Sequence, residues 1–510
     1  MRILKYLLEK KDFSFLLALS CAFFFLVMSD ATSWYYSSIG DEYAFFSFAQ
    51  KIITGETPVS IFSNPQALNF FSQKGVYDVV PIAGSVYQSA VMAIAGMNHQ
   101  GWILSSVLIV ILSLWFFYFL VKDRYGKRVA AYAAVFFITS HYLWAFTHLG
   151  YWNIHVLLMP LAAFFFFQRG ILKKKWYLFL IAGIFAGLGF YTYFTARIAL
   201  PFLLLWSMYE HRFFKQNFFF FIIFCIGVAV LLVPYIAANQ EAVIGQMIER
   251  SAVGSTELVG HNRFLLGASN ITHSFLGFFK NSQTSHFVSG SLVDPLTGIF
   301  FAAGLILFLF GWKKHGGVLI FFFLSLIAIA GFSPYLYTPI TRLFFLLPFV
   351  ACLAGYSLEK LRLYTEKKYP HIRLSLIPIA ILALVLLLNL YRFYIYTPKQ
   401  MDLTPEALTL QQLQTFPPCQ ISPILISPYS GSLLIPAVST HLLSQSVIFL
   451  DSISQLSSNE INKGHCFVFL EKNSDEFEYL LRTYDQKENL IRETSYSPSR
   501  TTSIEIFYKK

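Results

Sequence analysis

Long apolar segments recur along most of this chain. A membrane-spanning helix needs about 17 to 25 consecutive residues that are mainly apolar, and the part up to Leu390 offers about eleven such stretches when short or broken helices are included. Hydrophobic residues make up 56% of the chain and charged residues only 13%, which excludes an ordinary soluble domain. We therefore predict a polytopic α-helical membrane protein.

The predicted spans share an apolar core rich in phenylalanine. Their approximate cores are Phe13 to Thr32, Trp102 to Val121, Val129 to Trp144, Trp152 to Phe167, Trp176 to Phe190, Ile198 to Met208, Phe218 to Ala238, Leu296 to Trp312, Val318 to Gly331, Pro339 to Tyr356, and Leu374 to Leu390. The stretch from Ile198 is short and contains Pro201, so it is the least typical of the set.

The loops between these spans alternate in charge. Lysine and arginine gather in every second loop, and short basic loops mark the cytoplasmic side of a membrane. These basic loops are 122–128, 169–175, 210–215, 313–315 and 359–373. The alternation predicts an odd number of spans, with a cytoplasmic N-terminus and an extracytoplasmic C-terminal tail. A cleaved signal peptide at the N-terminus is an alternative, but it leaves an even number of spans.

The formal net charge of +11 is divided among these loops. Nucleic-acid binding needs a basic face that is continuous, so this distribution excludes it. Membrane lipids are the partners that such a chain requires. The pattern places the protein in a plasma or inner membrane.

Two outer loops, 33–101 and 239–294, are longer than simple connections, and long ordered loops often carry function. Apolar residues recur at helical spacing from Tyr43 to Ile53, which predicts a helix in the membrane interface. Ser85 to Met97 is either a second such helix or the outer part of the following span. We assign residues 1–395 to a transmembrane domain that includes both loops.

Residues 396–510 are more polar and have the length of a small domain. Four short β-rich runs and a helix-like stretch predict an α/β domain outside the membrane. The runs are Ile424 to Ser427, Ser446 to Leu450, Cys466 to Leu470 and Ser503 to Tyr508, and the helical stretch is Asp475 to Arg492. Cys419 and Cys466 lie in this domain, where an oxidising compartment would allow a disulfide. Cys21, Cys225 and Cys352 lie in spans as small packing residues.

Two adjacent carboxylates, Asp41 and Glu42, follow the first span, at the start of the predicted interface helix. A helix N-terminus favours acidic residues, so capping explains one of them. A pair at the mouth of a membrane cavity also suits a general base that deprotonates a hydroxyl group. The residues alone leave both interpretations open.

Outer arginines form a second group of candidates. Arg197 follows Tyr191 and Tyr193, and Arg342 opens an apolar span on the outer side, against the basic-inside trend. Each could snorkel to the interface. Each could instead bind an anionic phosphate, which a planar guanidinium grips well.

These motifs, in this order and on this side, resemble those of GT-C fold glycosyltransferases that use polyprenyl-phosphate sugars, near the protein mannosyltransferase and aminoarabinose transferase group. The resemblance covers the membrane part. It rests on Asp41-Glu42, Tyr191-x-Tyr193-x-x-x-Arg197, Asp294 to Gly298 at the start of a span, and Pro339-x-x-Thr341-Arg342 before Pro348.

The resemblance implies a reaction at the outer face of the membrane. Asp41 would be the general base for an acceptor hydroxyl of a lipid, glycan or protein, and Glu42 would support it. Arg197, Arg342 and Lys74 would hold the phosphate of the polyprenyl-phosphate-linked sugar donor. Inversion at the anomeric carbon would release polyprenyl phosphate, stabilised mainly by cations.

The segment from Thr147 to His155 departs from the family pattern, which often has an acidic residue or an arginine between the third and fourth spans. His148 and Asn153, with Tyr191 and Tyr193, are instead candidates to bind the sugar or the acceptor. The sequence predicts no cofactor, and a divalent metal lacks a ligand set with a carboxylate. An alternative from another class is a transporter or flippase for a lipid-linked or anionic substrate. It should show matching broken helices in two halves.

Overall fold

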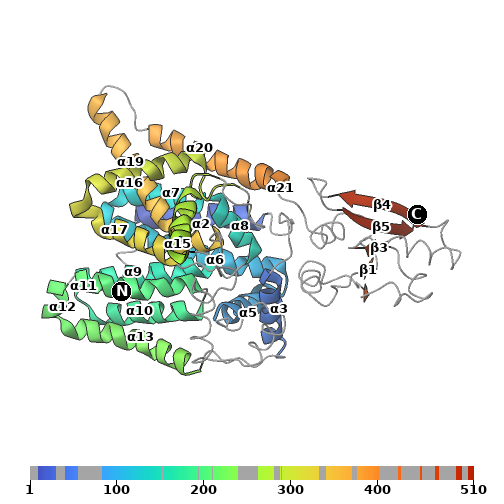
Figure 1. Cartoon of the computed structure of the whole chain (residues 1–510), viewed down its shortest axis with the longest axis horizontal. Helices are drawn as coiled ribbons and strands as arrows, with labels where there is room; N and C mark the ends of the chain where they lie inside the picture. Colours follow the sequence, from blue (N-terminus) through green and yellow to red (C-terminus); the bar gives the residue numbers. More distant parts are fainter. Residues whose placement is uncertain are drawn as a thin grey trace.

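The computed structural model of the chain describes sixteen stretches of residues. They are 10–29, 41–55, 83–150, 154–192, 194–209, 211–238, 262–280, 288, 290–331, 340–369, 376–400, 423–426, 448–450, 466–469, 490–496 and 503–509. A helical part and a small β-sheet make up this structure, and the sheet lies beyond one end of the helices (Figure 1).

The described helices lie in the first four-fifths of the chain. The α-helices are α2 (Lys10–Met28), α3 (Asp41–Ile53), α5 (Ala83–Ala95), α6 (His99–Tyr125), α7 (Lys127–Ile138), α8 (His141–Leu149), α9 (His155–Lys173), α10 (Trp176–Leu188), α11 (Ala199–Tyr209), α12 (His211–Gln216), α13 (Phe218–Ala238), α15 (Arg263–Leu276), α16 (Pro295–Phe310), α17 (Trp312–Leu326), α18 (Ile340–Leu343), α19 (Leu347–Lys368), α20 (Ile377–Tyr391) and α21 (Thr397–Gln400). Short 3-10 or π segments extend several of them: η2 (Gly189–Tyr191), η3 (Phe194–Ile198), η5 (Ile327–Gly331), η6 (Phe344–Leu346) and η8 (Arg392–Tyr396).

Each predicted apolar segment contains a helix. Among the described residues, five helices are long and apolar enough to cross a membrane, and the pair α7 and α8, bent by 53°, could make a sixth span. Five shorter apolar helices accompany them. The chain is thus a multi-pass helical membrane protein, while the number of about eleven spans stays a prediction. Pro201 falls in the first turn of α11, where proline is tolerated.

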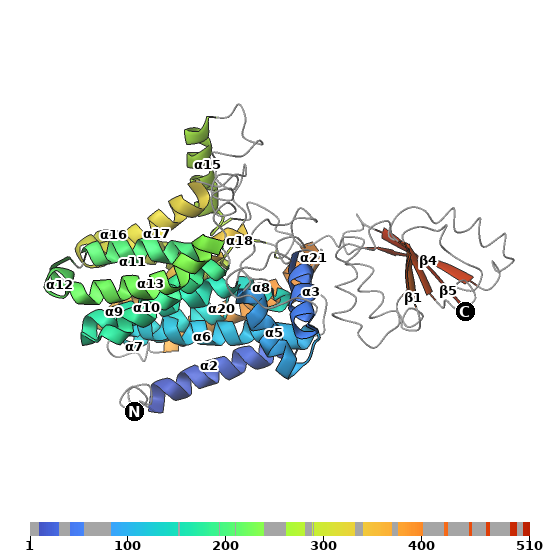
Figure 2. The same cartoon turned by 90° about the horizontal axis from the view of Figure 1, so that it is seen from below.

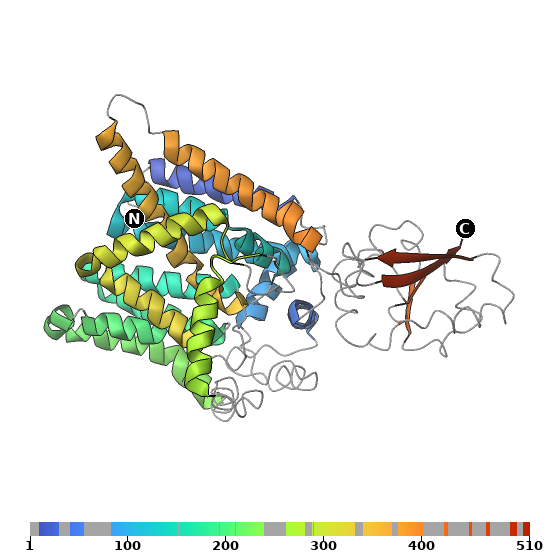
Figure 3. The ribbon, with the colours of Figure 1, turned by 45° about the horizontal axis from the view of Figure 1, so that its top comes forward.

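The long helices run side by side along one axis (Figures 1 and 2). At one end, which we name the basic end, lie α12 and the connections between α6 and α7, α9 and α10, and α16 and α17. At the other end, which we name the sheet end, lie α3, α5, α8 and α21, with the β-sheet beyond them (Figures 1 to 3). Helix α15 stands crosswise to the spans (Figure 2).

Charged residues at the basic end are paired. Asp12 is buried and lies 2.6 Å from Lys122 Nζ, and it also pairs with Lys127. Arg169 contacts Asp123 through its Nε and Nη2 atoms. Buried carboxylates of this kind are tolerated because each is paired with a cation.

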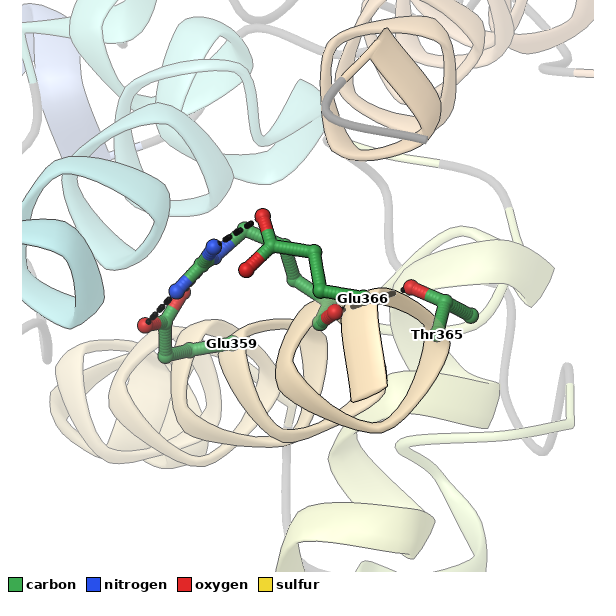
Figure 4. A network of polar contacts seen from close by, with 4 residues as sticks. Glu359, Thr365 and Glu366 are labelled. Carbon is green, nitrogen blue, oxygen red and sulfur yellow. Dashed lines mark hydrogen bonds and ion pairs between the residues drawn. The ribbon is translucent and has the colours of Figure 1, made fainter. Parts of the chain in front are cut away.

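A further network lies on α19 near its basic end. Arg362 binds both carboxylate oxygens of Glu359 at 2.7 Å and also pairs with Glu366 (Figure 4). The hydroxyl of Thr365 donates to the carbonyl of Arg362 at 2.8 Å. Positions three and four residues apart face one another on a helix, so one arginine joins two acidic residues.

The sheet contains five described strands in the order β2-β1-β3-β5-β4. The strands are β1 (Pro423–Ile426), β2 (Ile448–Leu450), β3 (Cys466–Phe469), β4 (Leu490–Tyr496) and β5 (Ser503–Lys509). β1 pairs in parallel with β2 and β3, and β5 pairs antiparallel with β3 and β4.

The sequence predicted four of these strands, but one assignment at the C-terminus was wrong. Leu490 to Arg492 were assigned to the end of a helix, and they instead begin β4. Pairing with β5 along its full length decides the conformation, a non-local effect that a helical pattern in isolation cannot show. The rest of the predicted helix, and the domain boundary at residue 396, lie outside what the described residues test.

Candidate active site

The two candidate carboxylates open a helix at the sheet end. Asp41 and Glu42 are the first residues of α3, as the apolar spacing predicted. Their side chains lie outside the described part of the structure. The position of α3 is nevertheless fixed by its apolar face, on which Phe46, Phe48 and Ala49 are buried.

Arg342 lies at the sheet end as well. It belongs to the short helix α18, directly before η6 and α19, and only 8% of the residue is exposed. A guanidinium buried to this degree in a membrane protein is costly, so residues of this kind usually carry function. Binding of an anion by Arg342 stays a prediction.

Arg197 is held against α13. Its Nη2 atom donates to the hydroxyl of Tyr235 at 2.9 Å, and its guanidinium lies 5.6 Å from the Tyr235 ring and 5.9 Å from the Phe190 ring. The hydroxyl of Tyr191 donates to the carbonyl of Leu231 at 2.8 Å. Arg197 of η3 and Tyr191 of η2 are thus both held by contacts with α13. A substrate contact by either residue stays a prediction.

His148 is buried in α8. Its Nδ1 atom donates to the carbonyl of Trp144 at 2.9 Å, and its ring lies 5.1 Å from that of Phe393. Three further candidates, Lys74, Asn153 and Tyr193, lie outside the described residues. Within the described part of the chain, no three His, Cys, Asp or Glu side chains lie close enough together to hold a metal ion.

An apolar cavity of about 370 Å³ runs through the helical part between α6, α9, α11, α17 and α19. Arg124 and Gln168 line it near the basic end, whereas almost all of its other lining residues are apolar or aromatic. Leu205 of α11 and Ile320 of α17 both line the cavity and are 46% exposed. The side of the cavity between α11 and α17 is therefore accessible from outside the helical part.

Two segments that carry candidate arginines lead into the sheet end of this cavity. Its lining there includes Val156 and Phe202 near the first residues of α9 and α11, and Phe345 of η6. Arg342 precedes Phe345 by three residues, and Arg197 precedes Phe202 by five. The two arginines thus come from segments that enter the same end of one apolar cavity.

A buried hydrogen-bond network that the sequence analysis missed also lies at the sheet end. Asp294 caps α16 through the amides of Leu296 and Thr297, and its Oδ2 atom accepts a hydrogen bond of 2.8 Å from the amide of Asn389. The Oδ1 atom of Asn389 accepts from both the backbone and the Nδ1 atom of His141. The available signal was a lone asparagine in an otherwise apolar span.

One turn beyond Asn389, Arg392 binds the loop that leads into α16. Its Nη1 atom donates to the hydroxyl of Ser291 at 3.2 Å and to the carbonyl of Val293 at 3.1 Å. Asn389 and Arg392 together fasten the last predicted span to the segment that ends the second long loop.

A second connection links α5 with α6 and α8. Tyr87 donates to the carbonyl of Ser105 at 3.0 Å, and burial raises the pKa of Tyr87 to about 12, so its hydroxyl stays protonated. The buried Gln88 donates through its Nε2 atom to the carbonyl of Gly150 at 2.7 Å. α5 is therefore a separate helix that packs on the next span, rather than part of it.

Comparison with known proteins gives this arrangement a context. Residues 79–236 match a family described as dolichyl-phosphate-mannose-protein mannosyltransferase. No curated protein shows a significant sequence match.

The structure of ArnT from Cupriavidus metallidurans bound to undecaprenyl phosphate is similar over 98% of this chain and 98% of that one, with a TM-score of 0.56 and 11% identity. The structure of ArnT from Cupriavidus metallidurans in the apo state has a TM-score of 0.50 and 11% identity, over 96% of this chain and 97% of that one. The oligosaccharyltransferase of Archaeoglobus fulgidus has a TM-score of 0.45 and 14% identity, over 98% of this chain and 74% of that one.

The likeness to ArnT spans nearly the whole of both chains, and it confirms at the level of the fold the GT-C resemblance that the motifs indicated.

Proposed function

We propose that this protein is an integral-membrane glycosyltransferase that moves a sugar from a polyprenyl-phosphate donor to an acceptor hydroxyl. The observation that carries the proposal is the apolar cavity, which is accessible from outside the helical part and has Arg342 and Arg197 on the segments entering its sheet end. Such a cavity suits a hydrocarbon chain, and burial of each methylene group contributes about 0.8 kcal/mol.

A donor bound in this way would place its phosphate at the sheet end, near α18. Arg342, Arg197 and Lys74 would then neutralise the phosphate, which gains charge as the bond to the sugar breaks. The same end of the molecule carries α3, which begins with Asp41 and Glu42. The phosphate site and the candidate base thus belong to one end of the helical part.

The proposed reaction is a single displacement. Asp41 takes the proton of the acceptor hydroxyl, and the acceptor oxygen attacks the anomeric carbon from the face opposite the phosphate. The bond between that carbon and the phosphate oxygen breaks, polyprenyl phosphate leaves, and the configuration inverts. Glu42 supports the base, while Tyr191, Tyr193, His148 and Asn153 bind the sugar or the acceptor.

We place the sheet end outside the cytoplasm. The basic loops lie at the opposite end, as expected for the cytoplasmic side. Cys466 of β3 is disulfide-bonded, whereas Cys21, Cys225 and Cys352 are free, and Cys419 lies outside the described residues. Disulfides persist in oxidising compartments, which supports an extracytoplasmic sheet.

Binding of undecaprenyl phosphate to the purified full chain tests the lipid site. A ligand that binds only the folded state raises its stability by about 2.7 kcal/mol at a hundred times its dissociation constant, which appears as a higher melting temperature. We expect Ile320→Trp, which narrows the side opening, to remove most of this shift. Ile306→Trp is the matched control, because Ile306 is also exposed but does not line the cavity.

Undecaprenol, which lacks the phosphate, separates the two parts of the site. The wild-type protein should prefer the phosphate to the alcohol, and Arg342→Gln should abolish that preference while still binding the chain. Equal shifts for Ile320→Trp and Ile306→Trp would contradict the assignment of the cavity.

A further inference from the structure

The helix that begins with the candidate base contacts a tryptophan of α6. Phe46 of α3 contacts Trp102 of α6, with ring centroids 5.3 Å apart and an angle of 55° between the rings. Both side chains are fully buried. Phe46 lies five residues after Asp41, so this contact is within two helical turns of the proposed base.

The same tryptophan also meets the end of α8. Gly150 caps α8 in the left-handed conformation, with φ of +62°. A Cβ atom on Gly150 would lie 2.5 Å from Trp102 Cε2, so the backbone lies directly on the indole ring. Only glycine satisfies both the conformation and the close approach.

Gln88 of α5 fixes this turn from a second direction. Its Nε2 atom donates to the carbonyl of Gly150 at 2.7 Å, and the side chain is fully buried. A buried hydrogen bond of this kind contributes to stability, because without it the carbonyl would be desolvated with no hydrogen bond to offset the cost. Gly150 therefore has its backbone held on one side by an indole ring and on the other by an amide.

These contacts connect two parts of the proposed active site. α3 starts with Asp41, and Gly150 precedes Asn153, a candidate for binding the sugar or the acceptor, by three residues. We propose that Trp102 and Gln88 are positioning residues that hold α3 and the end of α8 as one unit. The inference rests on the proposed function, since it assigns the unit to the alignment of base and substrate.

Hydrogen exchange of the purified full chain tests the physical part without any substrate. In Trp102→Ala, amide exchange across residues 41–53 should become several times faster, because the helix loses the contact of Phe46. Trp102→Phe should retain most of the protection. The control is Trp115→Ala on the same helix, where the indole donates to Ser20 and packs against Phe13, away from α3. Unchanged exchange of residues 41–53 in Trp102→Ala would overturn the proposal.

Gln88→Met tests the second contact, since it keeps the length of the side chain and removes the donor. It should speed exchange at residues 147–150 while leaving α6 protected. The same protection as in the wild type at 147–150 would show that the amide contact does not hold the turn.

Kinetics test the link to catalysis, with synthetic polyprenyl-phosphate mannose and polyprenyl-phosphate aminoarabinose as donors, a simple alcohol as the acceptor hydroxyl, and released polyprenyl phosphate as the readout. Trp102→Ala should lower kcat by about ten- to a hundred-fold with little change in KM, because misplacement affects chemistry more than binding. In an Asp41→Asn background, the same change should cause no further loss. An equal loss in both backgrounds would contradict positioning of Asp41.

The exchange and kinetic experiments together distinguish failure of this inference from failure of the proposed function. If the wild-type protein releases no polyprenyl phosphate, or if Asp41→Asn is fully active, the proposed reaction or its base is wrong. The exchange data then still decide whether Trp102 and Gln88 hold α3 and the end of α8.

Discussion

Asn389 forms four hydrogen bonds in the interior of the helical part. Its amide group donates to Asp294 at 2.8 Å and to the carbonyl of Val385 at 2.9 Å, and its oxygen accepts twice from His141. The residue is 1% exposed. With all of its polar atoms paired, it joins α8, α16 and α20 at one point.

Asn389→Leu should destabilise the protein, because it keeps the size of the side chain but removes the amide that donates to Asp294 and the oxygen that accepts from His141. Each unpaired group costs about 1–3 kcal/mol. Thermal unfolding in lipid nanodiscs measures the effect. Asn217→Leu is the control, because Asn217 is half-buried and its side chain donates to the carbonyl of Phe213, four residues earlier in the chain. Equal melting temperatures for the two variants would show that the network contributes little.

At the scale of single residues, sequence reasoning found the candidates with unusual chemistry but not their partners. Arg342 stood out because it breaks the charge pattern, and its burial agrees with a functional role. Gln88 and Asn389 gave only a weak signal, since one amide in an apolar stretch does not reveal what it meets. Gly150, Asp294 and His141 are 62 to 248 residues from the residues that they contact. Such pairings depend on tertiary structure.

At the scale of secondary-structure elements, two helices approach each other closely through glycine residues. α10 and α13 cross where Gly183 faces Gly227, and a Cβ atom on Gly183 would lie 2.2 Å from the carbonyl oxygen of Phe224. Small residues at such crossings allow helices in membranes to pack tightly, where there is little hydrophobic force between them. This pair anchors the segment that orients Tyr191 and Arg197.

Gly183→Ala should therefore destabilise the protein, although alanine normally stabilises a helix relative to glycine by about 1 kcal/mol. The added methyl group would push α10 and α13 apart. Gly317→Ala is the matched control, because a Cβ atom there would meet nothing within 4 Å. The melting temperature should fall for Gly183→Ala and stay or rise for Gly317→Ala. The opposite order of melting temperatures would show that α10 and α13 can accommodate a methyl group at their crossing.

Hydrophobic length located the helices well, because a span must hide its backbone from lipid. The residues at which helices begin and end were less predictable where a span is broken. The sequence placed one span from Val129 to Trp144, whereas Thr139 and Ser140 separate α7 from α8 with a bend of 53°. The bend is stabilised by contacts from other helices, including Asn389, and not by a proline or glycine within the segment.

In the molecule as a whole, the basic loops and the candidate site residues lie at opposite ends of the helical part. The basic loops gather at one end, and the buried arginine, the helix that begins with Asp41, and the β-sheet occupy the other. The apolar cavity reaches this end through Val156, Phe202 and Phe345. The fold class was predictable from hydrophobicity and motif order. The convergence of the two arginine-bearing segments on one cavity was not, because it requires the packing of five helices.

The central claim is that Asp41 drives transfer of a sugar from a polyprenyl-phosphate donor. Mass spectrometry of lipid extracts tests it most directly, in cells that lack the protein and carry either the wild-type chain or Asp41→Asn. We predict that one polyprenyl-phosphate-linked sugar accumulates without the protein, that the wild-type chain removes it, and that Asp41→Asn does not, although this variant still binds undecaprenyl phosphate. No change in any lipid-linked sugar, or full removal by Asp41→Asn, would contradict the account.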